Sequence, residues 1–163
     1  PQAGCLAGRA DLIARMRSNP LARALRADKI TLAALEATLA LYRDRDQALA
    51  SIPVLRMLTT ASEILATRAE QLRAAVLAEL DPRLEPGQSA VGGGSFPAAE
   101  LPTTLVTLAA PGIGANALAL HLRLGSPSVL ARVESGRVVL DPRTLTDAQL
   151  PVVAAAVAAA PWR

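Results

Sequence analysis

The sequence has 163 residues, enough to bury the hydrophobic core of one small domain or of one domain with part of another. Alanine and leucine carry most of its 52% hydrophobic content and aromatic residues make up only 2%, a composition that is typical of helices and offers few rings on which unpaired bases stack. The net charge of +3 comes from 16 arginines and one lysine spread along the chain, which argues against a DNA-binding surface, and the single cysteine excludes an internal disulfide.

The first twenty residues predict a strand followed by a helix. Residues 3–8 are small and apolar, as in a buried strand, and Cys5 within them is expected to be a buried structural thiol. Residues 9–18 then carry apolar side chains at helical spacing, and Asn19-Pro20 ends that helix because the position before a proline disfavours helical backbone.

Two longer helices are expected in the middle of the chain. Apolar residues recur at helical spacing from about Asp28 to the charged run at 43–46, which is read as a solvated face. After Pro53 a second apolar series extends to about residue 80, where Asp81-Pro82 is expected to stop it. Thr60 or Ser62 would cap its start.

The second half of the chain predicts a mixture of strands and helices. Glycine and proline punctuate residues 82–111, which contain β-branched stretches and are expected to be rich in strands. Residues 114–124 form an amphipathic pattern that is typical of a helix, with Gly125 as its C-cap.

A hairpin and a last helix complete the predicted elements. Two β-branched stretches at 129–133 and 138–140 are separated by Ser135-Gly136, which suits a tight turn. Residues 147–160 then predict a helix. The order of elements indicates an α/β fold, with a boundary near residues 43–53 between elements of something larger and a small C-terminal α/β domain.

Candidate chemistry is sparse on the residues alone. The glycines of Val91–Ser95 match neither a P-loop nor a dinucleotide-binding motif, so a tight loop near a ligand and a flexible turn both stay open. His121 has no partner at a metal-ligand spacing, and we expect no metal site. Lys29 follows Asp28, and we expect the two to form an ion pair that keeps the amine protonated.

Four segments together resemble one family. They are "PQAG", "PLARALRADKITLAALEATLALY", "IPVLRML" and "VGGGSFPAAELP", and their order and distances resemble the C-terminal portion of bacterial L-seryl-tRNA(Sec) selenium transferases, the selenocysteine synthases. The resemblance covers nearly the whole chain. It implies that the chain is a C-terminal fragment of a longer enzyme.

The resemblance implies a fold and a reaction. Members of the family are fold-type I enzymes that use pyridoxal 5'-phosphate, so residues 1–45 would be the end of the large cofactor-binding domain with the interdomain helix, and residues 46–163 the small α/β domain. Seryl-tRNA(Sec), held as an imine, would lose water to give an aminoacrylyl intermediate, to which selenium from selenophosphate adds. The Schiff-base lysine is expected upstream of Pro1, so the fragment alone would be inactive.

The resemblance also implies site residues and partners. Arg23 and Arg26 match arginines that hold the selenophosphate anion, and two guanidiniums one helical turn apart would offer several donors to its oxygens. Gln2 would lie near the cofactor, whereas Lys29 does not match the Schiff-base position. The whole enzyme is expected to be a cytoplasmic homo-oligomer of dimers that binds seryl-tRNA(Sec) and selenophosphate, but neither membrane nor DNA.

Two other readings stay open at this point. A related pyridoxal-phosphate lyase that acts on a small phosphorylated amino compound would use the same arginines, because its substrate also presents phosphate. The chain could also be a non-catalytic helical interaction module.

Overall fold

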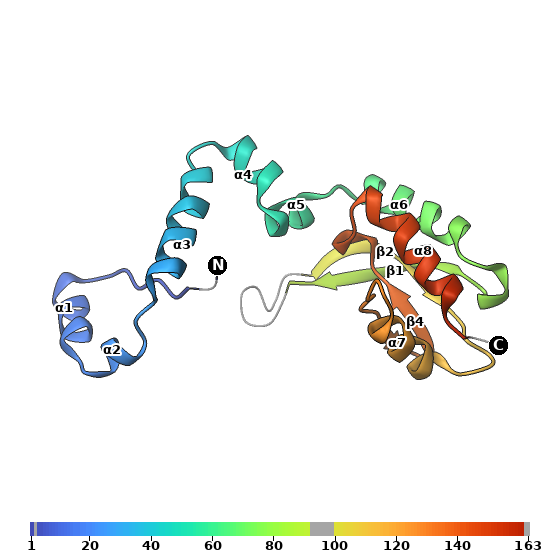
Figure 1. Cartoon of the computed structure of the whole chain (residues 1–163). Helices are drawn as coiled ribbons and strands as arrows, with labels where there is room; N and C mark the ends of the chain where they lie inside the picture. The colour runs from blue at the N-terminus through green and yellow to red at the C-terminus, as the bar shows by residue number, and fades with distance from the viewer. Residues whose placement is uncertain (2, 92–99, 162–163) are drawn as a thin grey trace. The chain divides into compact units, whose positions relative to one another are not determined.

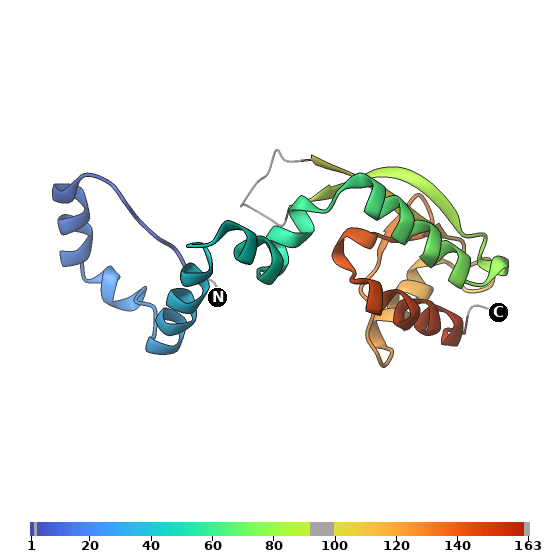
Figure 2. The same ribbon diagram turned by 90° about the horizontal axis from the view of Figure 1, so that it is seen from above.

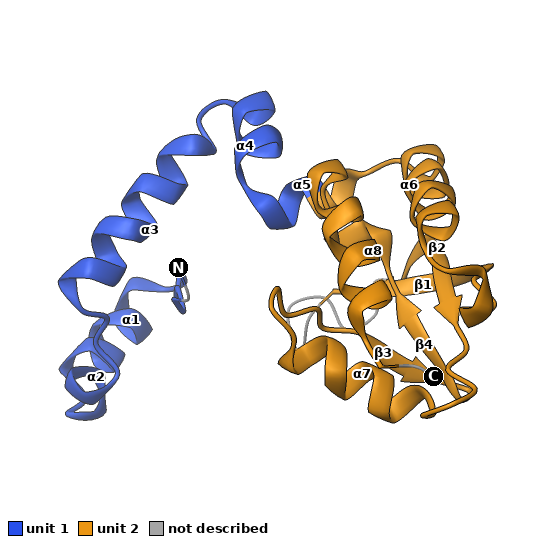
Figure 3. Ribbon diagram, turned by 45° about the vertical axis from the view of Figure 1, so that its right-hand side comes forward, with its two compact units in different colours: residues 1–56 blue, residues 57–163 orange. Residues whose placement is uncertain are grey.

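The computed structural model describes residues 1, 3–91 and 100–161, and the chain forms two compact units, residues 1–56 and 57–163 (Figure 3). The change from one unit to the other falls within helix α5 (Pro53–Thr59). The assignment of residues 1–45 to a large domain and of 46–163 to a small domain stays a prediction.

The first unit consists of short helices. Their bounds are α1 (Ala10–Ser18), α2 (Leu21–Ala24), α3 (Lys29–Leu41) and α4 (Arg45–Ser51), followed by the start of α5. Aspartates fix two of the starts: the carboxylate of Asp28 accepts hydrogen bonds from the first turn of α3, and that of Asp44 from the first turn of α4. The predicted helices at 9–18 and after Asp28 are confirmed.

The predicted strand at residues 3–8 is wrong. This segment has no regular secondary structure, its residues are exposed, and Cys5 is exposed as well. A strand needs a neighbour that accepts and donates its backbone hydrogen bonds, and the described part of the first unit contains no second strand. The small apolar side chains of residues 3–8 would permit burial, but they do not supply the neighbouring strand that a sheet requires.

The second unit is built on a four-stranded antiparallel sheet (Figure 1). Its strands are β1 (Arg83–Ala90), β2 (Glu100–Leu108), β3 (Arg132–Glu134) and β4 (Arg137–Leu140), in the order β1-β2-β4-β3. Strands β3 and β4 form the predicted hairpin, and the turn residues Ser135 and Gly136 both have positive φ, at 49° and 74°. The chain is therefore mixed α/β, as the sequence predicted.

Three helices cover one face of this sheet and enclose the core. They are α6 (Ser62–Ala75), α7 (Ala115–Leu124) and α8 (Leu150–Ala159), and α6 and α8 run side by side (Figure 2). Fully buried residues from all three helices and from the sheet share one cluster, including Leu72, Val106, Leu118, Val138 and Val157. Gly125 follows α7 as its C-cap, as predicted.

The helix predicted to reach residue 80 ends earlier. Its last residue is Ala75, because Val76 adopts an extended backbone with ψ of 149°, and only a short 3-10 turn, η1 (Ala78–Leu80), comes before the sheet. The two predicted capping hydroxyls, Thr60 and Ser62, do not occupy its N-cap position, which belongs to Ala61. Two more 3-10 turns, η2 (Pro142–Thr144) and η3 (Asp147–Gln149), lead from β4 to α8.

Candidate functional site

Arg23 lies on the short helix α2. The side-chain carbonyl of Asn19 accepts a hydrogen bond from the backbone N–H of Leu21 at 3.0 Å, which starts the helix after Pro20. The helix ends at Ala24, so Arg23 is in its last turn, where a cation is favourable because the unpaired carbonyls carry partial negative charge. Its side chain is exposed.

Arg26 does not share a helical face with Arg23, which corrects the geometry expected from their spacing. Leu25 already leaves the helix, and Arg26 lies in the irregular stretch before α3. Asp28, two residues after Arg26, adopts an extended backbone with φ of −74° and ψ of 171° and caps α3. The short stretch with Arg26 therefore links two separate helices.

The carboxylate of Asp28 is committed to capping. It accepts hydrogen bonds from the N–H of Ile30 at 2.8 Å and the N–H of Thr31 at 2.9 Å, and from the Thr31 hydroxyl at 2.9 Å. The bonds from Thr31 and then that from Ile30 lower the pKa of Asp28 below its ordinary value. Among the described residues no ion pair joins Asp28 to Lys29, so the pair expected from the sequence is wrong, and Lys29 is an exposed first residue of α3.

The guanidiniums of Arg23 and Arg26 are available to a ligand. Within the described part of the chain neither forms a hydrogen bond or an ion pair, whereas Arg9 is paired with Asp11 at 2.8 Å. Residues 12–27 contain four arginines and no acidic residue. This local excess of positive charge favours an anion, and planar guanidinium donors suit the oxygens of a phosphate.

A hollow of about 800 Å³ is lined by residues close to these arginines along the chain, but not by the arginines themselves. Its wall comes from α1, α2 and the segment before them and is mostly apolar, with Leu6, Leu12, Met16, Leu21 and Leu25. Arg15 contributes the only charged side chain among the residues that line it. Arg23 and Arg26 thus lie on an open surface rather than in this hollow.

Lys29 does not have the surroundings of a Schiff-base lysine. Lys29 is exposed at a helix start, and a Schiff-base lysine is activated by a desolvated pocket or by a neighbouring cation. The predicted cofactor contact Gln2 lies outside the described residues, and so do the glycines 92–94.

The second unit holds a buried polar cluster that sequence reasoning missed. The Arg143 side chain donates from Nε to the Ser89 hydroxyl at 2.9 Å, and from its two terminal nitrogens to the carbonyls of Met57 at 2.9 Å and Pro102 at 2.6 Å. The carboxylate of Asp141 accepts from the hydroxyls of Ser89, at 2.6 Å, and Thr103, at 3.0 Å. In the sequence, Asp141-Pro142 indicates the start of a helix, but it does not indicate that Arg143, the residue that follows, is buried.

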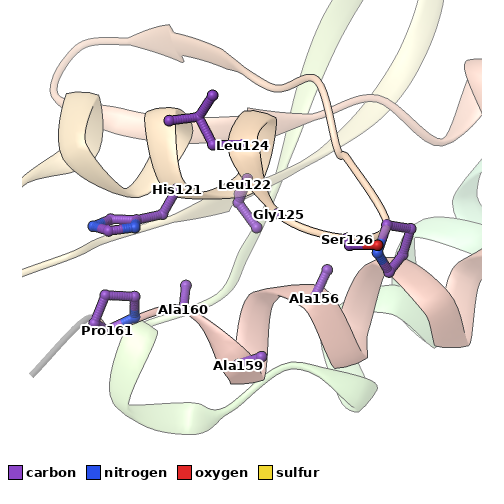
Figure 4. Close-up of a pocket in the computed structure, with 10 residues that line it drawn as sticks. His121, Leu122, Leu124, Gly125, Ser126, Ala156, Ala159, Ala160 and Pro161 are labelled. Carbon is purple, nitrogen blue, oxygen red and sulfur yellow. The ribbon is translucent and has the colours of Figure 1, made fainter.

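His121 lies at the edge of a second hollow, of about 250 Å³, between the ends of α7 and α8 (Figure 4). The side chains around it are mostly apolar or small, including Ala156 and Ala160. Across the described residues there is no group of three or more histidine, cysteine or acidic side chains that suits a metal ion. A helix long and apolar enough to cross a membrane is likewise missing from that part of the chain.

Comparison with known proteins gives consistent matches along the chain. The family model described as SelA, L-seryl-tRNA selenium transferase, matches residues 1–146. Proteins named L-seryl-tRNA(Sec) selenium transferase from Geobacter metallireducens and Solidesulfovibrio magneticus are each 48% identical, over 96% and 98% of this chain. A protein of the same name from Moorella thermoacetica is 47% identical over 89% of the chain. The chain spans 35%, 35% and 32% of the length of these relatives.

Proposed function

Because this chain belongs to the L-seryl-tRNA selenium transferase family, we propose that it is part of an enzyme that converts seryl-tRNA(Sec) to selenocysteinyl-tRNA(Sec) with selenophosphate. The match of the family model to residues 1–146 carries this proposal, and the relatives at 48% identity support it. Since the chain spans about a third of those relatives, the reaction is assigned to the whole protein and not to these residues alone.

The finer features follow the family resemblance. The whole protein would be a cytoplasmic fold-type I enzyme and a homo-oligomer of dimers. Pyridoxal phosphate would supply the electron sink for removing the serine hydroxyl. We assign most of its binding to the part of the large domain outside this chain, with Gln2 as the contact proposed within it. Residues 1–45 would end the large domain, and 46–163 would form the small one.

The role proposed for this chain's own residues is anion binding by Arg23 and Arg26. Selenophosphate is a small anion with several oxygens, and each guanidinium offers up to five N–H donors in a fixed plane. The two arginines come from different backbone environments, one helical and one irregular, so their side chains are not restricted to a single face. Their lack of partners among the described residues supports this role.

The test replaces each arginine with alanine in the full-length enzyme. We expect Arg23→Ala and Arg26→Ala each to raise the KM for selenophosphate about tenfold or more, because each removes charge-assisted hydrogen bonds to the anion. Cofactor binding, followed by its visible absorbance, should stay unchanged. Steady-state kinetics at varied selenophosphate and fixed seryl-tRNA(Sec) measure the effect.

Arg17→Ala is the matched control. Arg17 lies in the last turn of α1, is exposed and belongs to the same positively charged stretch, but is not one of the two proposed ligands. If all three variants raise the KM equally, the stretch acts only through its overall charge. Unchanged kinetics in Arg23→Ala and Arg26→Ala would contradict the assignment.

The family match favours the transferase over the other two readings. The relatives reported above carry the name of a tRNA-dependent selenium transferase rather than of a lyase. The four-stranded sheet of the second unit does not suit a purely helical interaction module.

A further inference from the structure

Arg143 is the one charged side chain among the buried residues of the described chain, with 6% of its surface exposed. Removing a guanidinium from water is costly unless its donors are satisfied, so a buried arginine has a structural reason for its position. Its contacts supply that reason: each of its three nitrogens donates to an oxygen, and the three oxygens come from different elements.

These contacts join α5 to the sheet. Nε reaches the Ser89 hydroxyl on β1, and one terminal nitrogen reaches the carbonyl of Pro102 on β2. The other reaches the carbonyl of Met57, which is one of the last four carbonyls of α5 and has no partner within that helix. Arg143 therefore acts as a C-terminal cap for α5, supplied from a position 86 residues away along the chain.

Asp141 holds this cap in place. Its carboxylate accepts from the backbone N–H of Arg143 at 3.0 Å and from the hydroxyls of Ser89 and Thr103. Asp141 lies two residues before Arg143 in the sequence, and its carboxylate and the guanidinium share the Ser89 hydroxyl. This arrangement compensates the buried positive charge through a hydrogen-bonded network rather than a direct ion pair.

Helix α5 needs contacts beyond its own backbone hydrogen bonds. A helix of seven residues is unstable by itself in water, and none of the side chains of α5 is fully buried. On its other side, only Ile52 separates α5 from α4, and its backbone is extended, with ψ of 112°. The chain thus has a single non-helical residue between α4 and α5, just before the helix in which one unit changes to the other (Figure 3).

We propose that Arg143 is a positioning residue whose buried guanidinium caps the C-terminus of α5 and fixes that end of the helix to the sheet. This role is independent of the function proposed above. It assigns to Arg143 no contact with a substrate.

Hydrogen exchange in the full-length protein tests the proposal. In Arg143→Met, which keeps an unbranched apolar stem but no donor, we expect the backbone amides of residues 56–59 to exchange at least about tenfold faster. The amides of α6 and β2 should keep their protection, which distinguishes the loss of a cap from a general loss of stability. Arg143→Lys, which keeps the charge but reaches fewer acceptors at once, should give a smaller increase.

Arg137→Met is the matched control. Arg137 is also largely buried and donates to backbone carbonyls, those of Thr107 and Asp81, but it has no contact with α5. Its replacement should speed exchange around Asp81 and leave residues 56–59 unchanged.

Two results would overturn the proposal. The first is unchanged exchange of residues 56–59 in a folded Arg143→Met or Arg143→Lys protein. The second result is measured on the unaltered protein and applies even if both variants fail to fold. If the amides of residues 56–59 exchange far faster than those of α6, the end of α5 is not held to the sheet.

Discussion

The two units of the chain reach different degrees of burial. In the second unit the sheet and three helices enclose a cluster with many fully buried side chains, whereas the described part of the first unit buries only Ala48 and Ile52 among its hydrophobic residues. Large apolar side chains such as Leu25 and Ile30 are each 83% exposed there. Local signals suffice to form helices, but a core requires a second layer for them to pack against.

The largest difference between the units should appear when one core side chain and one exposed side chain are truncated. Leu118→Ala in α7 removes a fully buried side chain and should lower the free energy of unfolding of the second unit by about 2–5 kcal/mol. Ile30→Ala in α3 should change the stability by less than about 0.5 kcal/mol. Urea unfolding of the 163-residue chain, followed by circular dichroism, measures both.

Repeating the Ile30→Ala experiment in the full-length protein sharpens the comparison. A large loss there, but not in the 163-residue chain, would show that other protein covers this face of α3. Equal and small losses for Leu118→Ala and Ile30→Ala in the 163-residue chain would contradict the contrast between the units.

Replacing one glycine in each unit with alanine should give a smaller difference in stability. Gly136 has φ of +74° in the turn between β3 and β4, a conformation that is strained for alanine, so Gly136→Ala should destabilise the second unit by about 1 kcal/mol. Gly8 has no positive φ and open space around it, so Gly8→Ala should cost nothing measurable. Thermal unfolding of the two variants checks this, and equal shifts would contradict it.

The smallest expected effect is the pH dependence of the start of α3. The pKa of Asp28 is lowered in the folded chain by its bonds from Thr31 and Ile30, so its stabilising effect is complete above the ordinary value of 3.8 and is lost as the pH falls through the lowered pKa. The amide signals of Ile30 and Thr31 in NMR spectra should therefore shift only below about pH 4.

Asp28→Asn provides the control for this titration. Asparagine also caps helices but does not titrate, so the pH-dependent shift of the two amides should disappear in this variant. A shift that persists would mean that another group is responsible. Asp81 in the second unit also has a lowered pKa, caused first by Arg83 and then by Arg137, and its neighbours should respond in the same pH range.

Features with a local cause could be predicted from the sequence. The turn at Ser135-Gly136 follows from the ease with which glycine adopts positive φ, and the start of α3 near Asp28 follows from the apolar periodicity after it. The family, too, was identified from short motifs, and the comparisons confirm it.

Features that depend on distant residues could not be predicted. The burial of Arg143 results from oxygens of Met57, Ser89 and Pro102, which are far from it along the chain. Similarly, Arg23 and Arg26 have the spacing of a helical turn, but α2 ends at Ala24 and Arg26 lies in the irregular stretch before α3. The roles of Arg23, Arg26 and Gln2 stay predictions, because no observation on this chain tests them.

The strand order of the sheet has a kinetic consequence. Strands β1 and β2 are consecutive along the chain, as are β3 and β4, so each pair closes as a hairpin. The pairing of β2 with β4 instead joins Val106 to Leu140 across the whole of α7. Closing such a loop costs chain entropy before any contact compensates it, so we expect this pairing to limit the rate at which the second unit folds.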